Sequence, residues 1–462
     1  MNGKGQEYLT ELGLASLFLK TVGADQGKGW ICITPDGYFN ASPRGDQYLY
    51  VRIGNEVTGI DAYRSVFYWP EVVQARLAGL PDPEHRVTAS IQQAASFRPP
   101  MVTIQSPAQG SSVTTTTANL SVTIADQNQP VKNIKLLVNG RLLGRDEMGA
   151  ITGTGGLTVE KASLSVGGNQ QNVSFQLPVN LDPGLNIIEV VAFNGYAESR
   201  KTVELTWQTQ AGQQVALPNL RILAVGVNQY DNAGPRLRGL GNLNFCVNDA
   251  REIINSFKSQ EGKRYGRVNS LLIADGSAVT PTAKNIRDNL QFLAGAGPRD
   301  VILFFLAGHG VSDRAGRFFF LPRDAAFNAD GLPDPERSLS TDDIVSVLDE
   351  SGNRLVFIDA CRSGGVDGNR LLRSLMNSNA FVFSASQGNE ISEEIVALNH
   401  GVFSYRIIRE LQGAGAAKSA GSLGMLQLSG LVSNEVIRIT QNRQHPKSYY
   451  QGYHDFPVAE IR

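Results

Sequence analysis

A histidine and a cysteine, each at the end of an apolar stretch, are the residues of this 462-residue chain best suited to chemistry. His309 follows Phe-Phe-Leu-Ala-Gly at residues 304–308, and Cys361 follows Val-Phe-Ile-Asp-Ala at residues 356–360, about 50 positions later. A thiol is mostly protonated at neutral pH, and a neighbouring imidazole can take its proton and leave a thiolate nucleophile. The pair therefore predicts nucleophilic attack on a carbonyl carbon, provided that folding brings the two side chains together.

The histidine and the cysteine meet only if the strands before them are neighbours in one sheet. Largely continuous apolar runs, typical of parallel strands covered on both faces, predict strands at residues 221–227, 301–306, 355–358 and 381–383. In open α/β sheets functional groups gather beyond the carboxyl ends of the strands, where His309 and Cys361 both stand. Gly310 lets the backbone approach a substrate closely, so the amides of Gly310 and Cys361 are candidate donors to a tetrahedral oxyanion.

Helical patterns between these runs complete the domain. Residues 249–260 predict a helix with one buried stripe at helical spacing, formed by Ala250, Ile253, Ile254 and Phe257. A second helix is expected to begin at Thr280, the N-cap, with Pro281 in its first turn. Strands that alternate with helices over residues 218–462 predict a doubly wound α/β domain.

Residues 97–210 have a different composition, rich in Val, Thr, Ser, Asn and Gly. Residues 120–124 alternate with period 2, and residues 187–193 form a second strand-like run. Short strands are separated by the turn signals Asn139-Gly140, Asp182-Pro183-Gly184 and Asn194-Gly195. The pattern predicts an all-β antiparallel sandwich that resembles a bacterial immunoglobulin-like domain without the Cys…Trp…Cys core of antibody domains. We expect it to act as a spacer or a partner surface.

Residues 1–96 are expected to form a small N-terminal module without an activity of its own. A helix is predicted over residues 8–22, a strand and tight turn around Pro35-Asp36-Gly37, and an amphipathic helix over residues 70–77. The segment resembles the tail that follows WD-repeat arrays in bacterial multidomain proteins, but it has no propeller repeats of its own.

The composition favours a soluble cytosolic protein. The net charge is −1, which gives no electrostatic footprint for nucleic acid or anionic lipid. Three cysteines without C-x-x-C spacing argue against a disulfide framework, and the five histidines form no zinc-ligand pattern with them. The N-terminus lacks a signal pattern and no apolar run approaches the length of a membrane span. We therefore expect a cytoplasmic location.

The sequence resembles the caspase-like cysteine peptidase clan (peptidase family C14) over residues 220–462. The motifs that carry the resemblance are Cys246-Val-Asn-Asp-Ala250, Ala307-Gly-His-Gly310, Leu321-Pro-Arg-Asp-Ala325, Asp359-Ala-Cys-Arg-Ser-Gly364 and His400-Gly-Val-Phe-Ser-Tyr405. They are closer to bacterial metacaspases and orthocaspases than to animal caspases, since Asp359 replaces the caspase Gln. The resemblance implies a cysteine endopeptidase with His309 as general base and acid and Cys361 as nucleophile.

The resemblance also implies a preference for basic residues before the cut bond. Metacaspases place two carboxylates in that pocket, and the matching residues here are Asp249 and Asp359, with Ser384 at a further lining position. Two acids favour Arg or Lys and repel Asp. Other roles remain open: Asp249 could cap its helix, and Asp359 could hold a local turn. We interpret Cys246 as a core residue and His400 as structural.

The expected cofactor set is empty, with calcium left open because some metacaspases require it. Asp313, Asp324, Asp330 and Asp334 could supply oxygen ligands, but their spacing is no EF-hand loop. A peptidase that prefers Arg is expected to cut itself after Arg370 or Arg373. The implied partners are a protein substrate and an activator bound by the N-terminal domains, in bacterial signalling, cell death or defence, without nucleic acid or membrane. The alternative is a catalytically silent caspase-fold scaffold.

Overall fold

Two compact units make up the chain in this computed structural model. The first comprises Met1–Leu137 and Met148–Thr209, and the second comprises Val138–Glu147 and Gln210–Arg462. The structure describes residues 6–9, 16–21, 28–41, 45–53, 56–77, 79, 81–82, 97–160, 163–168, 172–210, 215–297, 299–312, 318–346, 353–360, 380–386, 390–415, 417, 421–449 and 455–461. The predicted division into domains 1–96, 97–210 and 218–462 stays a prediction.

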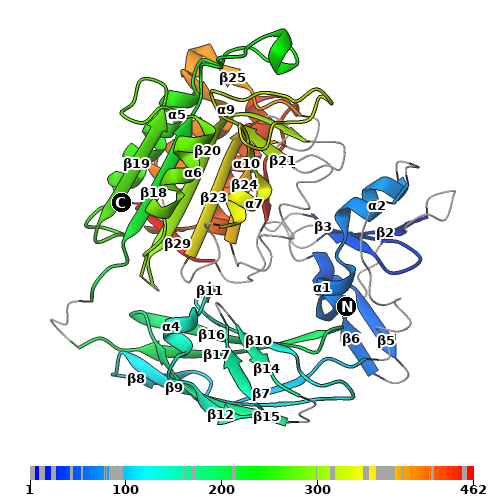
Figure 1. Cartoon of the computed structure of the whole chain (residues 1–462). Coiled ribbons are helices and arrows are strands. Elements are labelled where there is room, and N and C mark those ends of the chain that lie inside the picture. Colours follow the sequence, from blue (N-terminus) through cyan, green and yellow to red (C-terminus); the bar gives the residue numbers. More distant parts are fainter. Residues whose placement is uncertain are drawn as a thin grey trace. The chain divides into compact units, whose positions relative to one another are not determined.

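A mixed sheet forms the centre of the second unit (Figure 1). Its strands, in spatial order, are β19 (Val268–Ala274), β18 (Leu220–Gly226), β20 (Val301–Ser312), β23 (Asn353–Ala360), β24 (Ala380–Ser384) and β28 (Lys447–Tyr449). The first five are parallel, and β28 is antiparallel to β24. Beyond its parallel stretch, β20 pairs antiparallel with β21 (Phe318–Leu321), which pairs with β22 (Leu339–Ser340). The long central strand β20 thus reaches past the parallel part of the sheet.

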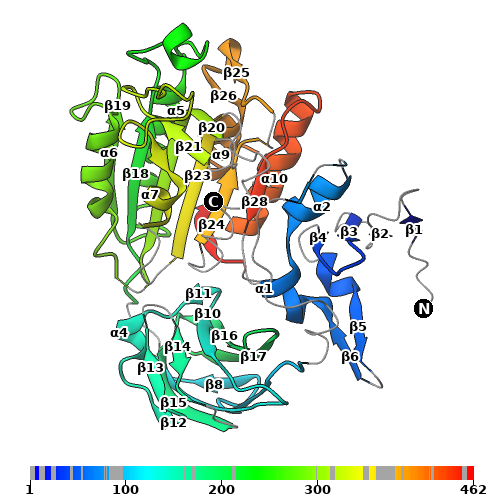
Figure 2. The same cartoon turned by 45° about the vertical axis from the view of Figure 1, so that its right-hand side comes forward.

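Helices cover both faces of this sheet, as Figure 2 shows. On one face lie α5 (Cys246–Lys258), α9 (Val402–Leu411) and α10 (Met425–Ile439), and on the other lie α6 (Ala283–Asn289) and α7 (Thr341–Ser346). Successive residues of β18 alternate between the two cores: Ile222 packs in one and Leu223 in the other. Burial on both faces explains the continuous apolar runs, and the predicted doubly wound α/β fold is confirmed.

Shorter elements complete the second unit. They are β11 (Arg141–Leu142), α4 (Arg145–Met148, all but its last residue), η3 (Pro235–Leu237), η4 (Leu290–Phe292), β25 (Glu394–Ile395), η5 (Val396–Leu398), β26 (His400–Gly401), β27 (Gly421–Gly424) and β29 (Pro457–Ile461). The strands β25 and β26 pair antiparallel, as do β27 and β29.

The predicted helix boundaries in this unit need correction. The helix predicted over residues 249–260 begins three residues earlier, at Cys246. The helix expected to begin at Thr280 begins at Ala283, with Thr282 as its N-cap. The hydroxyl of Thr282 accepts a hydrogen bond from the Asn285 amide, and this bond selects Thr282 as the cap.

Two sheets form the second half of the first unit. One has the order β13 (Leu157–Val159), β14 (Leu164–Val166), β10 (Asn133–Val138), β16 (Gly184–Phe193), β17 (Glu198–Trp207) and β8 (Ser111–Val113). The other has the order β12 (Thr152–Thr154), β15 (Asn172–Asn180), β9 (Thr117–Ala125) and β7 (Met101–Ser106). Buried residues alternate with exposed ones along β9 and β15, as expected of strands that bury one face. β8 pairs parallel with β17, whereas β16 with β17, β10 with β14, β13 with β14, β12 with β15, β15 with β9 and β9 with β7 pair antiparallel.

Residues 6–9 and 16–21 form strands and not the predicted helix. The elements are β1 (Gln6–Leu9), β2 (Ser16–Thr21), β3 (Lys28–Ile33), β4 (Phe39–Ala41), η1 (Gly45–Tyr48), β5 (Tyr50–Ile53), β6 (Glu56–Gly59), η2 (Ile60–Tyr63), α1 (Arg64–Phe67) and α2 (Pro70–Leu77). The helix expected over residues 8–22 was wrong, because β2 pairs with both β1 and β3 and this pairing outweighs local propensity. The helix predicted over residues 70–77 is confirmed as α2.

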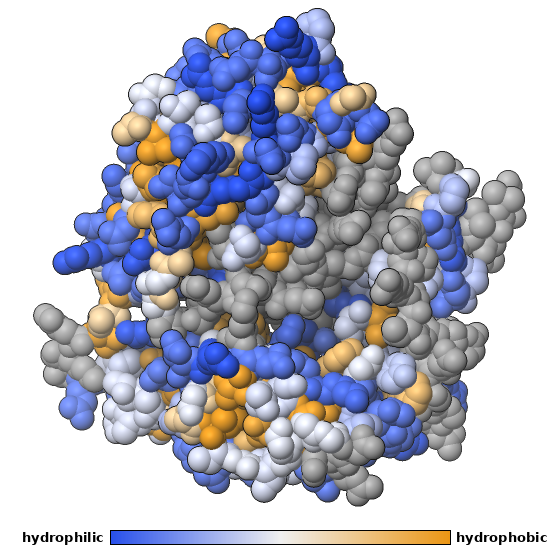
Figure 3. Space-filling model, viewed as in Figure 1, coloured by the Kyte–Doolittle hydropathy of each residue, from blue (hydrophilic) through white to orange (hydrophobic). Residues whose placement is uncertain are grey.

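The visible surface of the second unit is mostly hydrophilic, with apolar residues in small groups (Figure 3). Within the described part of the chain, no helix combines the length and the apolar character needed to cross a membrane.

Candidate active site

His309 lies in β20, just beyond the point where this strand leaves β23. The last parallel pair is Gly308 with Ala360, so the residues immediately before His309 and before Cys361 face each other on neighbouring strands. His309 itself pairs with Leu321 of β21. Cys361 lies outside the described residues.

The imidazole of His309 has one nitrogen engaged and one available. Nε2 lies 2.8 Å from the carbonyl oxygen of Gly241. A carbonyl only accepts, so Nε2 carries the proton, and in the neutral ring Nδ1 keeps its lone pair. Nδ1 is buried and has no hydrogen-bond partner among the described residues. The geometry thus selects the tautomer in which Nδ1 can act as a base.

Tyr230 fixes the backbone and the ring of His309. The Tyr230 hydroxyl accepts a hydrogen bond from the His309 amide at 2.7 Å, and the two ring centroids are 4.8 Å apart. Gly308 makes this approach possible, because a Cβ there would lie 2.9 Å from the Tyr230 hydroxyl and 3.0 Å from Phe320 Cζ. A side chain at position 308 would therefore push Tyr230 away from the histidine.

The loop that follows β18 holds the Gly241 carbonyl in place. Asn242 Oδ1 accepts from the Tyr230 amide at 2.9 Å, which ties the two histidine contacts to each other. Asp275 Oδ2 accepts from the amides of Asn228 and Gln229 at 2.7 and 2.9 Å. The loop is therefore anchored on both sides of Tyr230.

Burial lowers the pKa of His309 from its ordinary value. The hydrogen bond to the Gly241 carbonyl and the charge of Glu394 act in the opposite direction but do not outweigh the loss of water. His309 is therefore neutral, and able to accept a proton, over a wider pH range than an exposed histidine.

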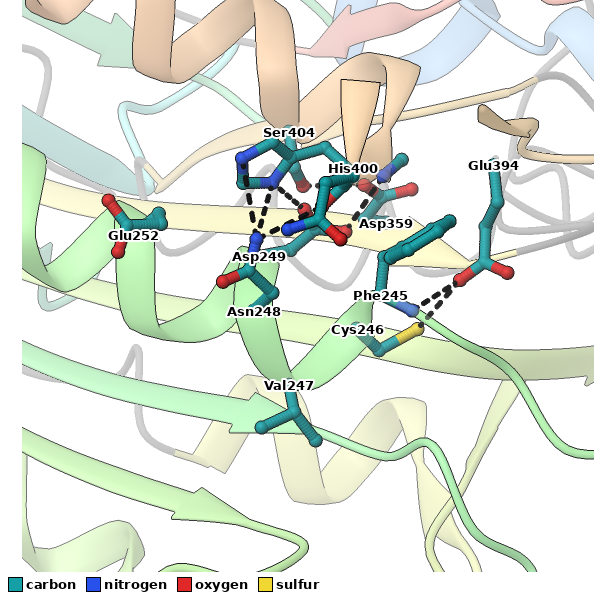
Figure 4. A network of polar contacts seen from close by, with 12 residues as sticks. Phe245, Cys246, Val247, Asn248, Asp249, Glu252, Asp359, Glu394, His400 and Ser404 are labelled. Carbon is teal, nitrogen blue, oxygen red and sulfur yellow. Dashed lines mark hydrogen bonds and ion pairs between the residues drawn. The ribbon is translucent and has the colours of Figure 1, made fainter. Parts of the chain in front are cut away.

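Asp249 is almost completely buried in the first turn of α5, with 1% of its surface exposed. Its Oδ1 accepts from His400 Nδ1 at 2.6 Å, and its Oδ2 accepts from the Gly401 amide at 3.1 Å (Figure 4). Burial, with the nearby charge of Asp359, raises the pKa of Asp249 to about 7, against the lowering effect of both hydrogen bonds. Since both contacts are far away in sequence, Asp249 does not cap its own helix.

Asp359 lies near the end of β23, beside Ala307 of β20. Its two oxygens accept from the hydroxyls of Ser392 and Ser404, each at 2.5 Å. Burial raises the pKa of Asp359 despite these bonds. Neither partner belongs to a local turn, which removes the simplest structural role considered for this residue.

Residues 392–401, here named the strap, connect the two acids. Ser392 contacts Asp359, and His400 and Gly401 contact Asp249. A Cβ at Gly401 would lie 3.0 Å from Asp359 Oδ2 and 3.2 Å from Asp249 Oδ2, so both carboxylates face the same glycine. Two buried acids converging on one point can bind a cationic side chain.

Glu394 fastens the middle of the strap to the start of α5. Its carboxylate accepts from the amides of Phe245 at 2.9 Å and Asn244 at 3.2 Å, and lies 4.0 Å from Cys246 Sγ (Figure 4). An anion is favourable at this helix end because unpaired amides and the helix dipole both point toward it.

Comparison with known families agrees with this geometry. A family model described as a caspase domain matches residues 220–455, slightly more than half of the chain. The chain belongs to the caspase domain family. A second model, described as a bacterial Ig domain, matches residues 100–175 and agrees with the two sheets found there, so an immunoglobulin-like domain precedes the caspase domain.

Relatives of the caspase domain include a plant protein. Metacaspase-6 of Arabidopsis thaliana is 28% identical over 156 residues, which cover 32% of this chain and 38% of that protein. The match thus spans well under half of the relative's length.

Matches to solved structures have low scores. Fibronectin(III)-like modules of Clostridium thermocellum CbhA give a TM-score of 0.16 at 14% identity, covering 24% of this chain and 98% of that one. A family 123 glycoside hydrolase from Clostridium perfringens gives 0.18 at 8% identity, covering 67% and 76%. Neither carries a structural argument.

The other predicted site residues of the caspase domain are distributed as follows. Gly310 pairs with Phe320 in the antiparallel part of β20. Ser384, at the end of β24, is buried beside Ile358, and its hydroxyl donates to the Ser386 carbonyl at 3.1 Å. The cleavage candidates Arg370 and Arg373 lie outside the described residues. Cys246 is buried in the core that covers one face of the sheet, as expected.

Two of the acidic residues considered as calcium ligands accept hydrogen bonds from backbone amides. Asp324 Oδ1 accepts from the Ala283 amide at the start of α6, and Asp334 Oδ1 accepts from the Glu336 amide within its own turn. Asp313 lies outside the described residues. Among the residues that are described, no group of three or more His, Cys, Asp or Glu side chains could hold a metal ion.

Several contacts of the caspase domain had no signal in the sequence. The Gly241 contact uses a main-chain oxygen, which any residue type supplies. Ser392 lies 33 positions after Asp359 in a segment without a recognisable motif. Ser404 and His400 do lie in a recognised motif, and that motif was the available clue to their contacts with the two acids.

Proposed function

We propose that this chain is a cysteine endopeptidase that cleaves proteins after Arg or Lys with a His309–Cys361 dyad. The observation that carries the proposal is the pairing of Gly308 with Ala360, because these residues directly precede the two members of the dyad. Consecutive Cα atoms are about 3.8 Å apart, so Cys361 is bonded to a residue beside the strand of His309. Membership of the caspase domain family supports the same chemistry.

In the proposed mechanism His309 first acts as a base. Nδ1 takes the thiol proton of Cys361, and the thiolate attacks the scissile carbonyl carbon. The amides of Gly310 and Cys361 donate to the resulting oxyanion. His309 then returns the proton to the leaving amine, which gives an acyl-enzyme, and a water molecule activated by His309 hydrolyses it.

The proposed preference for basic residues rests on Asp249 and Asp359. Both carboxylates are buried and face Gly401, so an entering guanidinium or ammonium group meets two acids. A substrate Asp would be repelled by the same pair. Ser384, which pairs with Ile358, the residue before Asp359, is proposed to line this site.

The biological setting belongs to the same proposal. We expect a regulated, self-processing peptidase in the cytoplasm, active in bacterial signalling, cell death or defence. The bacterial Ig domain match supports a module that holds an activator or a substrate protein near the peptidase.

Fluorogenic tetrapeptides ending in Arg, Lys or Asp test this function, each assayed with and without calcium chloride. We expect cleavage after Arg and Lys by the wild type and none by Cys361→Ala or His309→Ala. Cys32→Ala, which changes a buried cysteine of the first unit, serves as the control and should retain activity. Cleavage only after Asp would overturn the basic site, and no cleavage under any condition would favour the catalytically silent scaffold.

A further inference from the structure

We propose that His400 is a specificity-determining residue of the basic site: it keeps Asp249 ionised and oriented, and so sets the pH range in which the site accepts a cationic side chain. The inference rests on the proposed preference for Arg and Lys and adds a residue to it. His400 is a positioning residue and takes no part in the reaction at the dyad.

The shortest side-chain contact of His400 is with Asp249, and Asn248 Nδ2 lies 3.4 Å from both of its ring nitrogens. Nδ1 lies 2.6 Å from Oδ1, and when Asp249 is ionised Nδ1 carries the proton, because a carboxylate only accepts. The adjacent Gly401 amide donates to the other oxygen, so two neighbouring residues hold both oxygens of one acid. Asn248, the residue before Asp249, donates from its side chain to the Asn399 carbonyl at 3.0 Å and fixes the turn from which His400 projects.

The surroundings make this donor necessary. Asp249 lies near the negative charge of Asp359 and away from water, and both effects raise the pKa of Asp249. The hydrogen bond from His400 lowers the pKa of Asp249, and the Gly401 amide and then the charge of His400 add smaller effects in the same direction. Without His400 the pKa of Asp249 would lie higher still, so the acid would keep its proton to higher pH, and a neutral acid attracts a guanidinium only weakly.

The charged and titratable groups around this pair come from four elements. Asp249 and Cys246 belong to α5, Asp359 belongs to β23, Glu394 belongs to β25, and Tyr405 belongs to α9. The centroid of the Tyr405 ring lies 6.0 Å from that of the His400 ring, and the charge of Glu394 raises the pKa of Asp359. His400 is the only described histidine that contacts either acid.

The pH dependence of KM tests the proposal. Asp249 takes up a proton as the pH falls through about 7, so KM for an Arg-terminated peptide should rise below that pH in the wild type. In His400→Phe the rise should begin at higher pH, and KM at pH 7 should be about tenfold larger, because a hydrogen bond to a charged group is lost. His400→Asn, which places an amide donor near the position of Nδ1, should restore most of the affinity.

Two measurements separate this role from a general structural one. The rate of Cys361 alkylation by iodoacetamide reports on the dyad and should be unchanged in both variants, as should kcat. His445→Phe removes a comparable contact, from Nδ1 to Glu390 Oε1 at 2.6 Å, and should keep the wild-type KM profile.

The outcomes distinguish the two proposals. An unshifted KM profile in His400→Phe, with basic peptides still cleaved, would overturn the role of His400 and leave the proposed function standing. If His400→Phe lowered kcat and the alkylation rate as much as it raised KM, the role of His400 would be to stabilise the fold. A wild type that cleaves no basic peptide while Cys361 still reacts with iodoacetamide would overturn both.

Discussion

Two buried acids with remote partners are the clearest functional feature at the level of single residues. Asp249 and Asp359 each receive two hydrogen bonds, yet burial still raises the pKa of both. A group whose pKa is raised by folding makes the folded state less stable as the pH rises. Retaining such residues is typical of a site that gives up stability for function.

Asp249→Asn should separate the effect of Asp249 on stability from its effect on activity. The wild-type contribution of Asp249 to stability is lost as the pH rises from about 4 toward its folded pKa of about 7. At pH 8 we therefore expect the variant to match or exceed the wild-type free energy of unfolding by about 1 kcal/mol. In the variant, His400 can adopt the tautomer in which Nδ1 accepts a hydrogen bond from the side-chain amide group at position 249. No two hydrogen-bond donors then face each other.

Activity should move the other way in the same variant. We expect kcat/KM for Arg peptides to fall by about 100-fold, because one partner of a buried charge pair is lost. Urea unfolding at pH 5 and pH 8 and peptide cleavage measure the two effects. A variant that is less stable at pH 8 but cleaves normally would show that Asp249 stabilises the fold and does not bind substrate.

Residues whose side chains define the motif were predictable from the sequence, and those that act through the backbone were not. His309 stands at the end of an apolar strand, a pattern visible without a structure. The Gly241 carbonyl is a property of the chain path, so no residue type marks it. Cys361 stays a prediction.

At the level of elements, the strap is the segment that unites the site. It reaches Asp359 through Ser392 and the start of α5 through Glu394. Its own regular structure is short, limited to β25, η5 and β26, so side-chain contacts hold it in place. Sequence patterns identify long periodic elements and had no means of identifying this one.

Glu394→Ala should weaken the contact between the strap and α5. Loss of the acceptor at the first turn should cost about 1–2 kcal/mol of stability. Glu393→Ala is the matched control: its partner Arg443 is largely exposed, and such a pair contributes about 0–1 kcal/mol. Hydrogen exchange of the α5 amides should accelerate only in Glu394→Ala.

Urea unfolding of these variants should be followed by circular dichroism. Trp30, Trp69 and Trp207 all belong to the first unit, so tryptophan fluorescence reports on the other part of the chain. Equal effects of the two substitutions would show that Glu394 is an ordinary surface acid.

Pairing between strands explains where the prediction of elements went wrong. The strands of the central sheet were visible because burial on both faces leaves continuous apolar runs. The segment at residues 8–22 has no such pattern, and its strands depend on pairing with β3, which comes later in the chain. The sandwich was predictable from its turns, but the parallel contact of β8 with β17 was not.

At the scale of the whole molecule, the caspase domain follows an immunoglobulin-like domain in one chain. β23 ends at Ala360, β24 begins at Ala380, and the two strands are paired. A cut between them divides the chain into two fragments whose strands still belong to one sheet. Self-processing would therefore produce a nicked molecule that stays together.

We expect the wild type to cut itself after Arg370 or Arg373 under activating conditions. Mass spectrometry in denaturant should find two fragments, and native mass spectrometry should find one species of full mass. Cys361→Ala should stay intact in both measurements. An uncut wild-type chain that cleaves added peptides would remove self-processing from the proposal.

The oxygen that contacts the His309 imidazole belongs to the main chain, and this has a consequence for control of the proposed activity. Any residue type at position 241 supplies the same carbonyl oxygen, so a substitution there does not remove the acceptor. What can be adjusted is the course of residues 228–242, through Asn242, Tyr230 and the anchor at Asp275. A ligand that displaced this segment by about an ångström would remove the hydrogen bond that orients His309. The imidazole could then no longer accept the proton, although no residue of the motifs had changed.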